Sequence, residues 1–232
     1  MEHYLDNAAT TAVLPCAREA AVAAMDNFGN PGSLHARGTA ARKVLDDSRK
    51  ALAAALGCKP ACVTFTSGGS ESTNTALRGA VLKNKHVGKH IVSTQIEHDA
   101  TLNTLKALQN QGFEVTLLDV SKGHNITAQQ VKDAIREDTC LVTCMYANNE
   151  IGSVLPIAQI GAVCKQAGVP FHTDAVQAVG HIAFCNCGFY CKKKHCDRHY
   201  KAVFDCDVTV VAFVRGVQNF VCISRLYIGK FQ

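Results

Sequence analysis

The chain contains no tryptophan and only five tyrosines among its 232 residues. Without such rings, a stacking platform for single-stranded nucleic acid is not expected. No apolar run approaches the roughly 18 residues that a membrane span needs, so a membrane partner is not expected either. The opening residues, MEHYLDNAATT, lack the charged-then-apolar pattern of a secretion signal. We therefore expect a cytoplasmic protein.

Most of the chain has no excess of charge of either sign. Residues 1–184 carry 16 basic and 16 acidic side chains, whereas residues 185–232 carry 8 basic and 3 acidic ones. The net charge of +5 thus belongs entirely to the tail and says little about the partners of the main body.

Cysteine is plentiful and is divided in the same way. Six of the twelve cysteines precede residue 185, and they lie in apolar contexts that favour buried free thiols. These six are Cys16, Cys58, Cys62, Cys140, Cys144 and Cys164. Free thiols agree with a reducing cytoplasm.

Short β-branched runs alternate with helical patterns from about residue 60 to residue 174. The strands are expected at Cys62–Phe65, His90–Thr94, Phe113–Leu118, Thr139–Tyr146 and Val169–Asp174. The helices are expected at Arg37–Leu56, Glu71–Lys83, Ala100–Gln109, Thr127–Arg136 and Ile157–Gln166. This alternation predicts an α/β fold with a mainly parallel sheet and helices on both faces. Ligands of such sheets bind at the carboxyl ends of the strands.

The composition changes abruptly near Phe184, which marks a boundary. We expect one large domain over residues 1–184 and a divergent, cysteine-rich basic tail over residues 185–232. Within the tail, the apolar run Val208–Val214 is the one segment that reads as a strand.

Small residues separate the first expected strand from its helix in the run FTSGGSES, residues 65–72. Small residues let backbone N–H groups approach an anion, and a helix N-terminus favours negative charge. A phosphate cradle and a plain turn without a ligand are equally good interpretations of this run alone. A Walker-type loop is excluded because no Gly-Lys-Ser/Thr follows.

Polar residues follow three further strands. Asp174 ends an apolar strand, where an acid can pair with a protonated ring nitrogen of a cofactor or simply cap the next helix. His98 can lie flat on an aromatic ring or be a solvated surface residue. Asn148 and Asn149 can bind a ligand through their amides or form an ordinary turn. Together with the small-residue loop, these positions all fall at carboxyl ends of strands, which favours a common site.

These motifs, with YLDNAATT near the start, NFGNPGSLHARG at residues 27–38 and FHTDAVQAVG at residues 171–180, resemble the NifS-like cysteine desulfurases. The resemblance covers residues 2–184. It implies the large domain of a fold-type-I enzyme dependent on pyridoxal 5'-phosphate (PLP), with an N-terminal segment, about residues 1–15, belonging to a small domain. A homodimer is also implied. The implied reaction converts L-cysteine to L-alanine and passes the sulfur to an acceptor such as an iron–sulfur scaffold protein.

The resemblance also assigns roles to six residues, which are Gly69, Ser70, His98, Asn149, Asp174 and Gln177. The first two would hold the PLP phosphate. The histidine would stack on the ring and take part in catalysis, and the asparagine would contact the cofactor or the substrate carboxylate. The aspartate would pair with the pyridine nitrogen, and the glutamine would bond the ring oxygen.

The chain departs from this family after Phe184. The family carries a Ser-Gly-His-Lys-type motif whose lysine forms the Schiff base with PLP. His199 and Lys201 echo that motif with a spacing that is wrong by one, so Lys201 is a poor match for the Schiff-base residue. We do not expect this sequence to contain the persulfide cysteine or the small domain that carries it. We accordingly expect an incomplete sheet and a chain that is inactive as written.

Three interpretations of the tail stay open. It is a frameshift or splicing product that makes the chain a fragment, an unstructured basic extension, or a metal site. The metal ligands would be Cys185, Cys187, Cys191 and Cys196, although paired C-x2-C knuckles are absent. The alternatives to a desulfurase are accordingly a selenocysteine lyase-like enzyme, a non-catalytic PLP-binding fragment and a metal-binding protein.

Overall fold

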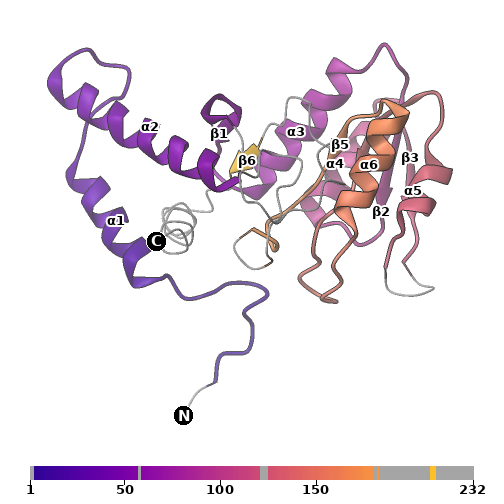
Figure 1. The fold of residues 1–232 in the computed structure, drawn as a ribbon, viewed down its shortest axis with the longest axis horizontal. Helices are drawn as coiled ribbons and strands as arrows, with labels where there is room; N and C mark the ends of the chain where they lie inside the picture. The colour runs from indigo at the N-terminus through magenta and orange to yellow at the C-terminus, as the bar shows by residue number, and fades with distance from the viewer. Residues whose placement is uncertain (1–2, 57–58, 121–124, 180–181, 183–209, 213–232) are drawn as a thin grey trace, which may run out of the picture. The chain divides into compact units, whose positions relative to one another are not determined.

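The structure is a computed structural model that describes residues 3–56, 59–120, 125–179, 182 and 210–212 (Figure 1). They form two compact units. The first contains the described residues up to Gly68 and residues 210–212, and the second those from Gly69 to Ile182. The division falls inside the expected large domain of residues 1–184, so the domain boundaries drawn from the sequence stay predictions.

A four-stranded parallel sheet forms the centre of the second unit, in the order β3-β2-β4-β5. Its strands are β2 (His90–Thr94), β3 (Glu114–Leu118), β4 (Thr139–Thr143) and β5 (Phe171–His172). Its helices are α3 (Gly69–Lys83), α4 (Asp99–Gln109), α5 (Ala128–Ala134) and α6 (Ile157–Ala167). The prediction of an α/β fold with a parallel sheet is confirmed.

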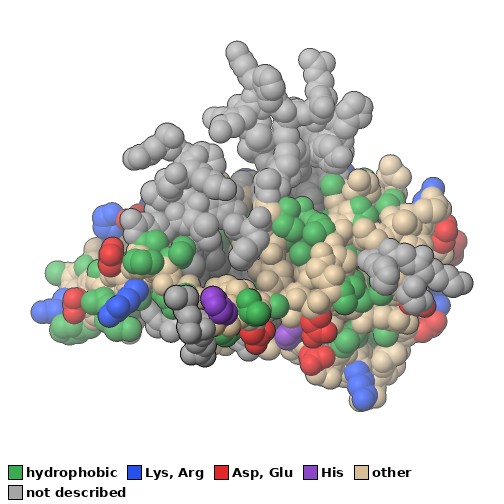
Figure 2. All heavy atoms as spheres, turned by 90° about the horizontal axis from the view of Figure 1, so that it is seen from below, with side chains coloured by type: hydrophobic (Ala, Val, Ile, Leu, Met, Phe, Trp, Pro, Cys, Tyr) green, Lys and Arg blue, Asp and Glu red, His purple; other side chains and the backbone are tan. Residues whose placement is uncertain are grey.

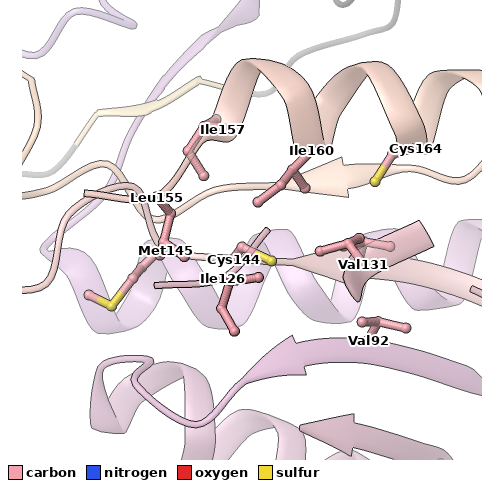
Figure 3. Packing of buried hydrophobic residues seen from close by; sticks show 10 residues of the cluster. Val92, Ile126, Val131, Cys144, Met145, Leu155, Ile157, Ile160 and Cys164 are labelled. Carbon is pink, nitrogen blue, oxygen red and sulfur yellow. The ribbon is translucent and has the colours of Figure 1, made fainter. Parts of the chain in front are cut away.

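The two central strands are buried along their whole length, as expected for a parallel sheet covered on both faces. Successive side chains of a strand point to opposite faces. Ile91 and its partner Leu141 pack with α3 and α4, whereas Val92 and its partner Val142 pack with α5 and α6. Figure 3 shows the second of these layers, with the side chains of α6 directed onto the strands.

Local signals in the sequence position the helix ends. Thr127 caps α5 through a reciprocal capping box with Gln130, in which each side chain accepts the other's backbone N–H. Gly168 ends α6 with φ of 70°, a left-handed conformation that glycine adopts without steric cost. These ends set where each connection returns to the sheet.

The first unit contains helices α1 (Pro15–Asp26) and α2 (Ala36–Leu56), a 3-10 turn at Pro60–Cys62, and strands β1 (Val63–Phe65) and β6 (Val210–Ala212). The two strands pair in parallel, with Val63 opposite Val210. The apolar run in the tail therefore contains a strand, as its sequence indicated, although a shorter one.

Two strands end earlier than the sequence predicts. β4 stops at Thr143 and β5 at His172. Beyond them the backbone N–H of Tyr146 still donates to the carbonyl of Asp174, at 2.8 Å. Asn148 and Asp174 consequently lie on loops that leave the sheet edge, held close to it by single hydrogen bonds.

Charged side chains of both signs are interspersed over the face shown in Figure 2, in keeping with the charge balance of residues 1–184. Within the described ranges, no helix has the length and apolar character needed to cross a membrane.

Candidate active site

The carboxyl ends of β2 and β4 mark the point where the strand order reverses. From β2 the chain passes through α4 to β3 on one side, and it then crosses back to β4 on the other side. Helices that follow the two strands cover opposite faces, which leaves a crevice between the strand ends. Residues directly after β2, β4 and β5 are therefore brought to one edge.

Glu97 follows β2 and is the buried member of the motif Glu97-His98, with only 5% of its surface exposed. Its Oε1 accepts hydrogen bonds from Oγ1 of Thr94 at 2.6 Å and from the backbone N–H of Met145 at 2.8 Å. Burial raises the pKa of Glu97 to about 7; those two hydrogen bonds lower it, and the nearby Asp174 raises it. No role for this residue was predicted from the sequence.

His98 is exposed and caps the N-terminus of α4. Its Nδ1 accepts a 3.0 Å hydrogen bond from the backbone N–H of Ala100. The neutral ring therefore carries its proton on Nε2. An exposed ring held at its backbone side is available to a ligand above the sheet edge, and the stacking role of His98 stays a prediction.

The two asparagines after β4 have different surroundings. Asn148 is tied into the loop, because its Oδ1 accepts from the backbone N–H groups of Glu150 and Ile151 and its Nδ2 donates to the carbonyl of Ile96. Asn149 is half-buried, and no hydrogen bond joins its side chain to another residue in the described part of the chain. Of the two, Asn149 has the amide free for a ligand.

Asp174 lies beyond β5 and is 8% exposed. Its Oδ1 accepts a 3.0 Å hydrogen bond from the backbone N–H of Val176, at the start of a turn, and no helix follows it within the described residues. Among the described residues, none donates to the other oxygen, Oδ2. A buried carboxylate with one uncommitted oxygen is a strong acceptor for a charged donor.

His172 precedes this acid on β5. Its Nδ1 lies 2.8 Å from Oγ1 of Thr143. Burial lowers the pKa of His172 to about 4, and Asp174 only partly offsets that effect. His172 is therefore neutral and supports β4 and β5 without contributing charge to the edge.

Gly69 and Ser70 begin α3, a helix of 15 residues, and Ser70 is exposed. Because α3 ends at Lys83 and β2 begins at His90, the helix runs back along the sheet and its N-terminus points to the edge where the strands end. Gln177 lies half-buried in the turn after Asp174 and already has an interaction partner.

Several predicted residues lie outside the part of the chain that the structure describes. These are Lys201, the echo of the Schiff-base lysine, and the four proposed metal ligands Cys185, Cys187, Cys191 and Cys196. Within the described residues, no group of three or more His, Cys, Asp or Glu side chains could hold a metal ion.

The site thus combines a helix N-terminus, a free amide and a buried acid at the reversal point of a parallel sheet. Such an arrangement is typical of enzymes that bind a phosphorylated cofactor at a sheet edge. Residues 3–189 match the family model described as aminotransferase class-V. The chain belongs to that family.

Two curated relatives are similar to this chain in sequence. The cysteine desulfurase IscS of Methanosarcina thermophila is 46% identical over 180 residues, which is 77% of this chain and 45% of that protein. The putative cysteine desulfurase IscS 1 of Bacillus subtilis is 46% identical over 178 residues, 76% of this chain and 47% of that protein. The chain spans about half the length of the curated relatives it matches.

Solved structures agree. SspA in complex with cysteine is 38% identical, with a TM-score of 0.73 over 77% of this chain and 52% of that one. A NifS-like protein is 27% identical, with a TM-score of 0.80 over 98% of this chain and 69% of that one. The resemblance to the NifS-like cysteine desulfurases is therefore confirmed at the level of family and fold.

Proposed function

We propose that residues 69–182 form the cofactor-binding half of a PLP-dependent cysteine desulfurase. In the whole enzyme, sulfur leaves L-cysteine, L-alanine remains, and the sulfur passes to an acceptor such as an iron–sulfur scaffold protein. Support comes from relatives named cysteine desulfurase at 46% identity and from the cysteine bound in the SspA structure. A cytoplasmic homodimer is part of the same proposal.

The buried Asp174 carries the proposal. Its Oδ1 is fixed by the N–H of Val176 and its Oδ2 is left without a described donor, which fits a protonated pyridine nitrogen. Gly69 and Ser70 open a helix N-terminus that fits a phosphate. The remaining contacts would be His98 against the ring, the free amide of Asn149, and Gln177 at the ring oxygen.

PLP, when bound, supplies an electron sink for the carbon atoms of an amino acid. The residues described here would bind and orient it. Asp174 would hold the proton on the ring nitrogen, because a buried carboxylate stabilises a neighbouring positive charge. His98 would present its face and its Nε2–H from the N-terminus of α4. The lysine that attaches PLP covalently is not among the described residues.

Titration of the purified chain with PLP, followed by its visible absorbance, tests this function. Asp174→Asn keeps an oxygen that can accept from Val176 but removes the charge. A lost charge-assisted hydrogen bond is worth about 1.5–3 kcal/mol, so PLP affinity should fall by about tenfold or more. The matched control is Asp26→Asn, which removes an exposed carboxylate from the first unit.

Stoichiometric PLP binding that weakens in Asp174→Asn and is unchanged in Asp26→Asn supports the proposal. A wild-type chain that binds no PLP, or an Asp174→Asn variant that binds it equally well, would show that this edge is not a PLP site.

A further inference from the structure

A buried acid links the two strand ends that meet at the reversal point. Oε1 of Glu97, which follows β2, accepts the backbone N–H of Met145, which follows β4, at 2.8 Å. Thr94 donates its hydroxyl proton to the same oxygen at 2.6 Å. The Glu97 carboxyl is therefore fixed from both strands.

A second link crosses the same gap in the opposite sense. Nδ2 of Asn148, after β4, donates to the carbonyl of Ile96, after β2, at 2.8 Å. The residue after each linking side chain is a proposed cofactor contact, His98 in one case and Asn149 in the other. The two links consequently set the spacing between these contacts.

The environment of Glu97 favours its uncharged form. Its second oxygen, Oε2, is buried and has no hydrogen-bond partner within the described ranges. An ionised oxygen left without donors costs more free energy than a neutral one. Burial raises the pKa of this carboxyl to about 7.

Among the described residues, two titratable groups interact electrostatically with Glu97. Asp174, after β5, disfavours a second negative charge and raises the pKa of Glu97. Cys144, directly after β4, has a pKa raised well above its usual value, first by burial and then by Glu97, so its thiol is neutral.

We propose that Glu97 is a neutral positioning residue, an uncharged carboxylic acid that ties the β2 end to the β4 end and thereby places His98 and Asn149 around the ring of the cofactor. This inference rests on the proposed PLP site. Glu97 itself would not contact the cofactor, whose phosphate would lie at Gly69 and Ser70.

Three variants distinguish the effect of the charge of Glu97 on PLP affinity from the effect of its link between the strand ends. Glu97→Gln keeps the accepting oxygen and mimics the protonated acid, whereas Glu97→Ala removes the link. Glu137→Gln is the control, since Glu137 is exposed. PLP affinity at pH 6.5 should stay within about twofold of wild type in Glu97→Gln and Glu137→Gln, and it should fall by about tenfold in Glu97→Ala.

Competition by inorganic phosphate distinguishes positioning from general damage to the fold. The inhibition constant of phosphate against PLP should be equal in all folded variants, because the proposed phosphate contacts lie on α3, whereas Glu97 lies between β2 and α4. Glu97→Asp, which withdraws the carboxyl by one methylene, replaces Glu97→Ala if that variant does not fold, with the same expectation.

A folded Glu97→Ala that binds PLP like wild type, or a Glu97→Gln as weak as Glu97→Ala, overturns the inference. A wild-type chain without PLP binding overturns the proposed function instead. Whether Glu97 forms an uncharged link between the two strand ends is then tested by unfolding the cofactor-free chain at pH 6. Equal stability of wild type and Glu97→Gln supports it, and a large loss in Glu97→Gln refutes it.

Discussion

Nδ1 of His90 lies 2.8 Å from Oγ1 of Thr139, inside the sheet and away from solvent. The other ring nitrogen, Nε2, lies 2.9 Å from Oγ1 of Thr116. One imidazole thus joins β2 to both neighbouring strands, β4 and β3. A neutral ring offers one donor and one acceptor, and two hydroxyls can satisfy both.

His90→Ala should destabilise the second unit strongly. The change leaves a cavity, and it removes the His90 partner of the Thr116 hydroxyl and one of the two partners of the Thr139 hydroxyl. It should cost about 2–4 kcal/mol. Urea unfolding followed by circular dichroism measures the loss. His86→Ala is the control, because His86 is exposed and its removal should leave the midpoint unchanged.

The same histidine should make stability fall in acid. Burial lowers the pKa of His90, as does Arg136, while Asp138 and Glu114 act in the opposite direction. Below pH of about 6.5 the unfolded chain takes up a proton that the folded ring resists, so stability decreases as pH falls. As pH falls from 7 to 5, the difference in the free energy of unfolding between wild type and His90→Gln should become smaller.

Glu97 should give the opposite dependence of stability on pH. Its pKa is raised from 4.5 to about 7 in the folded protein, so the folded state binds the proton more tightly than the unfolded chain. Stability is then fully present below pH 4.5 and is lost as pH rises through 7, by on the order of 3 kcal/mol. Unfolding of wild type against Glu97→Gln over this range isolates the effect. A constant difference between the two proteins would mean that Glu97 is ionised throughout.

The sequence predicted the strand–helix series well, because local signals determine it. His90–Thr94 is a strand with the predicted bounds, and the helix expected from Ile157 ends one residue later than predicted. The ends of β4 and β5 were placed too late. Their apolar pattern continues past the point where the sheet hydrogen bonds stop, and pattern alone does not reveal that point.

The site was predicted less completely, and Glu97 shows why. Its sequence neighbour His98 drew attention as a residue type that binds cofactors, yet the structure buries the glutamate and exposes the histidine. The burial arises because β4 lies beside β2 and supplies the N–H of Met145. That adjacency depends on the order of the strands within the sheet, which cannot be deduced from the order of the elements along the chain.

Buried thiols in the second unit should resist alkylation. Cys144 and Cys164 lie in the layer between β4 and α6 (Figure 3). Burial raises the pKa of Cys164 to about 12 and also raises that of Cys144 well above its usual value. Iodoacetamide needs a thiolate, so among the described cysteines of the folded chain it should modify the partly exposed Cys16 and Cys62 first.

Peptide mapping before and after denaturation measures this order, and denaturation should make all these thiols reactive. Rapid labelling of Cys144 or Cys164 in the folded chain would contradict the packing described. Their protection also means that neither thiol is available for reaction in the folded chain.

Two glycines of the second unit should respond to alanine in opposite directions. A Cβ on Gly88 would lie 2.3 Å from the carbonyl oxygen of Asp138, the group that accepts the backbone N–H of His90 at the start of β2. Because backbone has to move, Gly88→Ala should destabilise by about 1–3 kcal/mol. Gly79, inside α3, has no atom within 4 Å of its Cβ position apart from its chain neighbours and the nearby backbone of its own helix, so Gly79→Ala should stabilise by about 0.5–1 kcal/mol.

Urea midpoints of the two alanine variants against wild type test this pair, and each variant serves as the control for the other. Equal midpoints for Gly88→Ala and wild type would show that the connection before β2 does not approach Asp138 closely. Destabilisation by Gly79→Ala would show that this face of α3 is covered. If Gly88→Ala destabilises and Gly79→Ala stabilises the protein as expected, the close approach of the 84–89 connection to β4 is the constraint that fixes where β2 begins in the sheet. The same constraint then fixes the position of Glu97, which follows β2.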